Sequence, residues 1–134
     1  MPFVDLDLYF APIREAHRRT QLPGVEEGLS WGTPALKVNG KLMLRIREPD
    51  VIVLSCDVEE KEMLMHAAPE IYFQIDHYKG TPYVLVRLSA ISDEELDDRI
   101  ENAWRLNAPK NLRDDPTKQT LPAKPGSSST NTSG

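Results

Sequence analysis

Apolar and polar residues alternate through the middle of the chain, which is the pattern of β-strands that bury one face. The alternation is clearest on either side of Asn39-Gly40, a pair whose two residues both accept the positive φ of a two-residue hairpin turn. Further apolar runs, bounded by turn-forming residues, continue the pattern along the chain. It predicts strands at 35–38, 41–47, 51–56, 71–75 and 82–88.

Helical spacing flanks this strand region on both sides. Phe10 and Ile13 recur on one side of an expected helix, with charged residues on the other side. Later in the chain, Ser92 and Glu95 form a capping-box motif ahead of a long amphipathic segment. A shorter helix is expected over 57–68. We therefore expect an α+β fold: a two-layer sandwich with a mostly antiparallel sheet of about five strands and the N- and C-terminal helices packed on one face.

Length and composition fit one small domain followed by a tail. The 134 residues are 40% hydrophobic and 28% charged, the balance of a globular chain. After residue 112 large apolar side chains almost disappear, so this part cannot bury enough surface to offset its conformational entropy. We expect residues 1–112 to form the domain and 113–134 to be a disordered polar tail.

Charge and cysteine content narrow the functional classes. The formal net charge is -5, so any nucleic-acid site must be a local basic patch. No stretch approaches the roughly 20 apolar residues of a membrane-spanning helix, and the start lacks the pattern of a secretory signal. A single cysteine excludes an internal disulfide. These features predict a cytoplasmic protein without a membrane partner.

Patterns typical of catalysis and metal binding are weak. Cys56 follows Leu54 on the apolar side of an expected strand, which favours a buried, inert thiol over a nucleophile. The histidines His17, His66 and His77 lack the paired spacing of a metal site. We expect no enzyme activity, no metal and no cofactor.

Four blocks of sequence carry a family resemblance. They read LPGVEEG at 22–28, WGTPALKV at 31–38, HYKGTPYVLVRL at 77–88 and AWRLNAPK at 103–110. In this order and spacing the chain resembles the MmcQ/YjbR family over about residues 12–112.

The resemblance implies a fold similar to that of the bacterial frataxin homologue CyaY, in an arrangement described for the family as a double wing. It also implies DNA binding, the label that the family name carries, and no established enzyme activity. Frataxin-like proteins bind iron through an acidic ridge, but here Asp5, Asp7 and Glu15 are interleaved with arginines. Iron binding is therefore not expected.

A basic face on the second expected strand is the strongest local feature. Simple alternation turns Leu42, Leu44 and Ile46 towards the core and the intervening residues outward. This outer face is interpreted either as an anion-binding or nucleic-acid surface, acting through phosphate contacts and stacking, or as an ordinary solvated sheet face. The expected nucleic-acid-binding residues are Lys37, Lys41, Arg45, Arg47, Arg87 and Tyr83, with Met43 on the same side.

Two loop blocks rich in aromatic residues, glycine and proline provide the alternative site. Trp31, His77, Tyr78 and Lys79 would line a pocket for an anionic or planar ligand. In the other interpretation, Trp31 and Tyr78 seal the edge of the core. The sequence thus predicts a non-catalytic binding protein: a DNA-binding module with weak, salt-sensitive affinity, or a small adaptor or metabolite-binding domain whose partner is a protein or small molecule.

Overall fold

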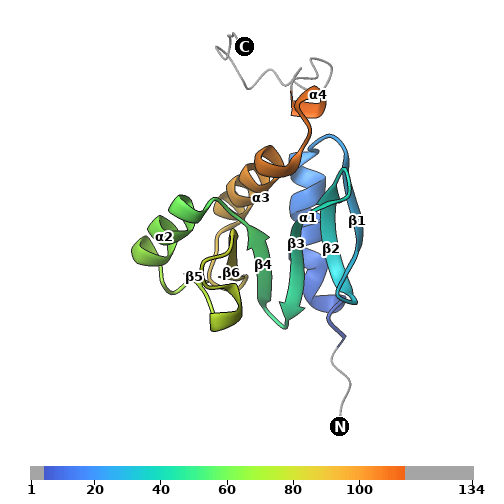
Figure 1. Ribbon diagram of the computed structural model, residues 1–134. Coiled ribbons are helices and arrows are strands. Elements are labelled where there is room, and N and C mark those ends of the chain that lie inside the picture. Colours follow the sequence, from blue (N-terminus) through green and yellow to red (C-terminus); the bar gives the residue numbers. More distant parts are fainter. Residues whose placement is uncertain (1–4, 114–134) are drawn as a thin grey trace.

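Six strands form one antiparallel sheet in the part of the chain that the computed structural model describes, residues 5–113 (Figure 1). The strands lie in the order β1-β2-β3-β4-β6-β5, so every pair of neighbours except β4 and β6 is consecutive in the chain. The strands are β1 (Val25–Ser30), β2 (Thr33–Val38), β3 (Lys41–Glu48), β4 (Val51–Ser55), β5 (Tyr72–Phe73) and β6 (Tyr83–Arg87). The helices are η1 (Leu8–Phe10), α1 (Ala11–Thr20), α2 (Val58–Ala67), η2 (Asp76–Tyr78), α3 (Asp93–Asn107) and α4 (Lys110–Arg113).

Helices α1 and α3 cover one face of the sheet, which confirms the α+β class. Ile13 of α1 and Ile100 of α3 are buried in the same cluster as the inward side chains of the central strands. Trp104 of α3 is also buried there, and its Nε1–H donates to the carbonyl of Pro23 at 2.8 Å. Helix α2 lies at the β5 end of the sheet (Figure 1). The main core is therefore the layer between α1, α3 and the strands.

The cap of α3 forms only half of the expected capping box. Ser92 Oγ accepts the N–H of Glu95 at 3.1 Å, as the motif predicts. The Glu95 carboxylate instead accepts the Tyr72 hydroxyl, and burial together with this carboxylate raises the pKa of Tyr72. Glu95 thus links α3 to β5 rather than closing the cap.

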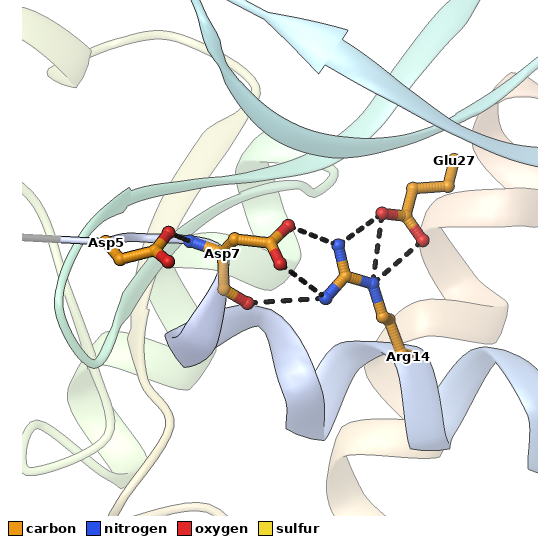
Figure 2. A network of polar contacts seen from close by, with 4 residues as sticks. All are labelled: Asp5, Asp7, Arg14 and Glu27. Atoms are coloured by element: carbon orange, nitrogen blue, oxygen red, sulfur yellow. Dashed lines mark hydrogen bonds and ion pairs between the residues drawn. The ribbon is translucent and has the colours of Figure 1, made fainter.

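Strand β1 is the element that the alternation pattern missed, which is why the sheet has six strands rather than about five. Two of its six residues are glutamates, so it does not read as apolar alternation. Figure 2 shows why a glutamate fits there: Arg14 of α1 donates from Nη2 to Glu27 at 2.5 Å and to Asp7 at 2.6 Å, while Asp5 accepts the N–H of Asp7. An ion-pair network therefore joins this edge strand to α1, in addition to Val25, which packs against the main core.

A β-bulge at Met43 corrects the predicted orientation of β3. Leu36 pairs with Leu44 and Lys37 pairs with Leu42, so Met43 is an extra residue on β3. Met43 is fully buried in the main core, whereas Leu42 is turned to the outer face. The expectation that Leu42 faces inward and Met43 outward is therefore wrong, because the bulge shifts the alternation by one residue.

The outer face of the sheet is partly covered, contrary to the expected open face. Val53 of β4 and Leu85 of β6 are 1% and 0% exposed on this side. They pack with Val51 and with the segment from Phe73 to Tyr83, which crosses the outer face. This second, smaller core leaves only the part of the outer face nearest β1, β2 and β3 accessible.

The expected tail, 113–134, lies outside the described residues apart from Arg113, which ends α4. Between residues 5 and 113, no helix has both the length and the apolar character needed to cross a membrane.

Candidate functional site

A pocket lies on the outer face, where the sheet meets the segment that covers it. Its volume is about 130 Å³. Strands β3 and β4 form its floor, the β1–β2 turn and η2 form its sides, and β6 contributes one residue. We call it the Arg45 pocket. Its lining residues are Trp31, Leu42, Arg45, Val53, His77, Tyr78 and Tyr83.

Arg45 is the charged group of this pocket and is held only by neutral oxygens. Its Nη2 donates to the Tyr78 hydroxyl at 3.2 Å, and its Nη1 donates to Thr33 Oγ1 at 3.3 Å and to the Ile46 carbonyl at 3.5 Å. No carboxylate of residues 5–113 pairs with it. These acceptors orient the half-buried guanidinium without neutralising it, and a guanidinium has five N–H donors to offer.

Aromatic rings form the wall beside Arg45. The rings of His77 and Tyr78 meet edge to face with centroids 4.8 Å apart, and those of Tyr78 and Tyr83 lie 6.4 Å apart at 67°. Such edge-to-face contacts are favourable arrangements of aromatic pairs. The wall is therefore a packed aromatic cluster with Tyr78 at its centre.

Lys61 holds this wall in place and was not among the residues predicted from the sequence. This lysine of α2 is 1% exposed, and its Nζ donates to the carbonyls of Tyr78 at 2.7 Å and Thr81 at 2.9 Å. Burial lowers the pKa of its ammonium group. Its position in a charged helical run, Glu59-Glu60-Lys61-Glu62, looks solvent-exposed, so local sequence carried no signal for it.

Trp31 stands at the mouth of the pocket with 88% of its surface exposed. It occupies the first position of the two-residue turn between β1 and β2, with φ of 54°, and Gly32 follows with φ of 77°. Asn or Gly is preferred in such a position because a bulky side chain at positive φ is strained. Trp31 therefore does not seal the core, so that interpretation is wrong for this residue.

The predicted basic face does not assemble as one surface. Lys37 lies on the outer side, but Lys41 pairs with the core residue Val38 at the strand end and therefore lies on the helix side. Arg87 lies 4.0 Å above the Phe73 ring and also donates to two carbonyls. The bulges and these local contacts separate charges that simple alternation had placed together.

Arg47, another residue of that face, is the extra residue of a second bulge between Ile46 and Glu48. Its Nη1 lies 3.7 Å from the Glu48 carboxylate. Of the six predicted nucleic-acid residues, only Arg45 and Tyr83 line the pocket.

Three of the four residues predicted for the ligand site come together in the structure. Trp31, His77 and Tyr78 all line the Arg45 pocket, although they come from segments 46 or more residues apart in the chain. Lys79 follows η2 and is exposed, and it is not one of the lining residues. The structure thus brings together parts of both predicted sites in one place.

Cys56 and the acidic side chains of α1 and α3 are not among the residues that line the Arg45 pocket. Cys56 is buried, and burial raises the pKa of its thiol to about 11, so it is protonated at neutral pH. Glu15 pairs with Arg18, and Asp97 pairs with Arg19. Within residues 5–113, no group of three or more His, Cys, Asp or Glu side chains is arranged to hold a metal ion.

Comparison with known proteins gives consistent matches. A family model described as YjbR matches residues 20–106. The uncharacterized proteins Rv2570 of Mycobacterium tuberculosis and Mb2600 of Mycobacterium bovis are each 36% identical over 89 residues, covering 63% of this chain and 69% of theirs.

One solved structure shares the fold. The crystal structure of Deinococcus radiodurans protein DR2400, a DUF419 domain, superposes with a TM-score of 0.59 at 21% identity. The match covers 70% of this chain and 74% of the other. At 21% identity this similarity shows a shared fold alone.

Proposed function

The chain belongs to the YjbR family, and from that premise we propose that it is a binding protein whose ligand carries a negative charge and occupies the Arg45 pocket. The protein acts by binding and not by catalysis. Its partner is a small molecule or the exposed group of a larger one.

The single observation that carries this proposal is the state of Arg45. A guanidinium that is half-buried and oriented by neutral acceptors keeps its full charge for an incoming anion. By contrast, Arg14, Arg19 and Arg99 each pair with a carboxylate. Arg87 is also held by neutral groups, but it lies against the Phe73 ring and is not a lining residue of the pocket. Arg45 is thus a preorganised cation at the wall of a pocket, which is an arrangement suited to anion recognition.

The test is calorimetric titration with acetate, benzoate, succinate, citrate and inorganic phosphate. At least one anion is expected to bind, and Arg45→Gln is expected to weaken it by about tenfold to a hundredfold, because hydrogen bonds to charged groups contribute about 1.5 to 3 kcal/mol. Arg105→Gln is the matched control, since Arg105 pairs with Glu101 on α3 outside the pocket. Absence of binding, or equal loss in both variants, would overturn the proposal.

Nucleic-acid binding by the same face is a second candidate from a different class. It is supported by Lys37 and Arg45 on the outer side and by Tyr83 as a stacking group. Acidic side chains weaken it, because Glu26 lies opposite Lys37 on β1 and Glu48 lies beside Arg47. Any affinity is therefore expected to be low and to fall steeply with added salt.

Fluorescence anisotropy with labelled single-stranded and duplex DNA at low salt tests this candidate. Binding should disappear in the double variant Arg45→Glu with Arg47→Glu. Binding that this variant leaves unchanged, or no binding at high micromolar protein, rules it out.

A further inference from the structure

We propose that the ligand group held in the Arg45 pocket is a single aromatic ring bearing one carboxylate, as in a monocyclic aromatic acid. This inference rests on the proposed function and specifies its ligand class. It follows from the size of the pocket, the chemistry of its walls, the number of its charges and the position of Trp31.

The size of the pocket fits one ring. Its volume is about 130 Å³. An engineered apolar cavity of about 150 Å³ binds benzene, so the space in this pocket matches a group the size of one ring. Sites for drug-sized ligands are larger, at roughly 300 to 1,000 Å³.

The walls of the pocket suit a flat, apolar ring. Leu42 and Val53 supply an aliphatic floor, and Tyr78 and Tyr83 supply aromatic edges and faces. An aromatic ring between such groups gains offset or edge-to-face contacts that an aliphatic ring of equal size lacks. The floor and wall therefore favour an aromatic group over a saturated one.

The charge inside the pocket matches one negative charge. Arg45 is the one Lys or Arg side chain among the described lining residues. The protein's own acceptors take three of the five N–H groups of its guanidinium, which leaves two for a ligand. Two donors on a planar fork fit the two oxygens of a carboxylate. A phosphate monoester carries about -1.5 to -2 charges at neutral pH, more than one guanidinium balances.

Trp31 provides the outer contact for the ring. It is exposed and has a positive φ, a strained conformation for a bulky residue, and strained residues cluster at active and binding sites. It is one of the residues that line the pocket and it is 88% exposed, so its indole is available to contact a bound ring from the solvent side. In this proposal a bound ring contacts Trp31 and the aromatic wall, and its carboxylate meets Arg45 on β3.

The experiment uses the full chain and four matched probes: benzoate, its neutral isostere benzamide, the saturated acid cyclohexanecarboxylate, and phenyl phosphate. Affinities come from two-dimensional NMR titrations that follow the indole N–H signals of Trp31 and Trp104. Benzoate is expected to bind about tenfold tighter than benzamide, which lacks the charged hydrogen-bonded contact. It is expected to bind about threefold to tenfold tighter than cyclohexanecarboxylate, which lacks the aromatic contacts, and tighter than phenyl phosphate, whose second charge is not balanced. The Trp31 signal should shift, and the signal of the buried Trp104 should not.

Two variants separate this inference from the proposed function. Arg45→Gln should abolish the preference for benzoate over benzamide, and Arg45→Lys, which keeps the charge but not the planar fork, should retain part of it. If acetate and cyclohexanecarboxylate bind as tightly as benzoate and still require Arg45, the ring inference is wrong while the anion site stands. Tighter binding of phenyl phosphate than of benzoate overturns the single-charge inference. If no probe depends on Arg45, both proposals fall.

Discussion

The arginines of this protein illustrate how neighbours decide the role of a residue. Arg14 and Arg19 join helices to other elements through carboxylates, and Arg87 is held over a ring and two carbonyls. Arg45 alternates with apolar residues much as Arg47 does in the sequence, but Arg47 ends beside Glu48. The same side chain is therefore a structural link in one place and a candidate binding group in another.

Replacing Trp31 by asparagine should maintain or raise stability while removing the proposed outer contact. Asparagine tolerates the positive φ of this turn, and relief of strain there is worth about 1 kcal/mol. Because Trp31 is 88% exposed, little buried area is lost. Urea denaturation gives the change in the free energy of unfolding. Trp31→Val is the control, since a β-branched residue is strained at this φ and should lower stability. A loss of more than about 1 kcal/mol in the asparagine variant would mean that the Trp31 side chain packs against the fold.

Cys56 should make stability fall at alkaline pH. Burial raises the pKa of its thiol from 9.0 to about 11, so the folded protein keeps a proton that the unfolded chain releases between these values. This contribution is complete below pH 9.0 and is lost as the pH rises through about 11. Over that range the wild type should lose about 2 to 3 kcal/mol more than Cys56→Ala. Equal slopes for the two proteins in denaturation curves at pH 8 to 11 would contradict this.

At the scale of elements, β3 departs from ideal alternation at two points. The bulge at Met43 places consecutive apolar residues, Met43 and Leu44, in the main core and turns Leu42 outward. The bulge at Arg47 then changes the register again before the turn into β4. Bulges re-aim side chains, and here the bulge at Met43 turns Leu42 to the apolar floor of the pocket beside Arg45.

Glutamine substitutions at two adjacent positions test the first bulge. Met43→Gln should cost about 3 kcal/mol, because it places an amide in a fully buried site. Leu42→Gln should cost less than about 1 kcal/mol, because residue 42 is partly exposed at the pocket. Simple alternation predicts the opposite order. Chemical denaturation of both variants decides between them.

Lys61 should control the order of the segment that forms the aromatic wall. In Lys61→Met the Thr81 carbonyl loses its donor, and a buried acceptor left unpaired costs about 1 to 3 kcal/mol. The variant also removes a buried charge, which offsets part of this loss in the free energy of unfolding of the whole protein. The main effect should therefore be a local loosening of the segment that Lys61 holds. Hydrogen exchange should speed up at the amides of Tyr78, Lys79 and Thr81.

Lys79→Met is the matched control for that experiment, because it removes an exposed lysine from the same segment. It should leave exchange unchanged. If Lys61→Met speeds exchange equally in α3, the lysine supports the whole fold rather than the wall.

At the scale of the whole molecule, the sheet is covered unequally on its two faces. The helix side carries the main core, and the outer side carries a small core at the β4–β6–β5 end only. The boundary of that small core is where the Arg45 pocket opens. The pocket exists because the segment from Phe73 to Tyr83 covers only part of the outer face. Complete coverage would fill the pocket, and an uncovered sheet would be flat.

Removal of residues 114–134 should leave the melting temperature within about 2 °C, because their composition provides almost no apolar surface to bury. Trp104→Ala should by contrast cost about 3 to 5 kcal/mol, since this buried side chain fills the main core and bonds the Pro23 carbonyl. Differential scanning calorimetry measures both. A much larger loss on truncation would place part of the tail within the fold.

The sequence alone was sufficient for the class of the fold and most of its elements. Periodicity reports which side of a strand or helix is apolar, and the Asn39-Gly40 turn and the α3 cap depend on local backbone preferences. Five of the six strands, the terminal helices on one face and the buried Cys56 follow from such local information. The aromatic character of the two loops that carry Trp31 and Tyr78 also follows from local sequence.

Contacts between distant parts of the chain decided the features that local sequence patterns do not encode. Strand β1 is formed by its pairing with β2 and is linked to α1 through a glutamate paired with Arg14. Lys61 is buried, and distant carbonyls accept from its ammonium. The bulge at Met43 exchanges the faces of neighbouring residues, since side chains alternate with a period of two and one extra residue inverts them. The pocket joins residues 31 to 83 of the chain, so only folding could bring Arg45 and its aromatic wall together.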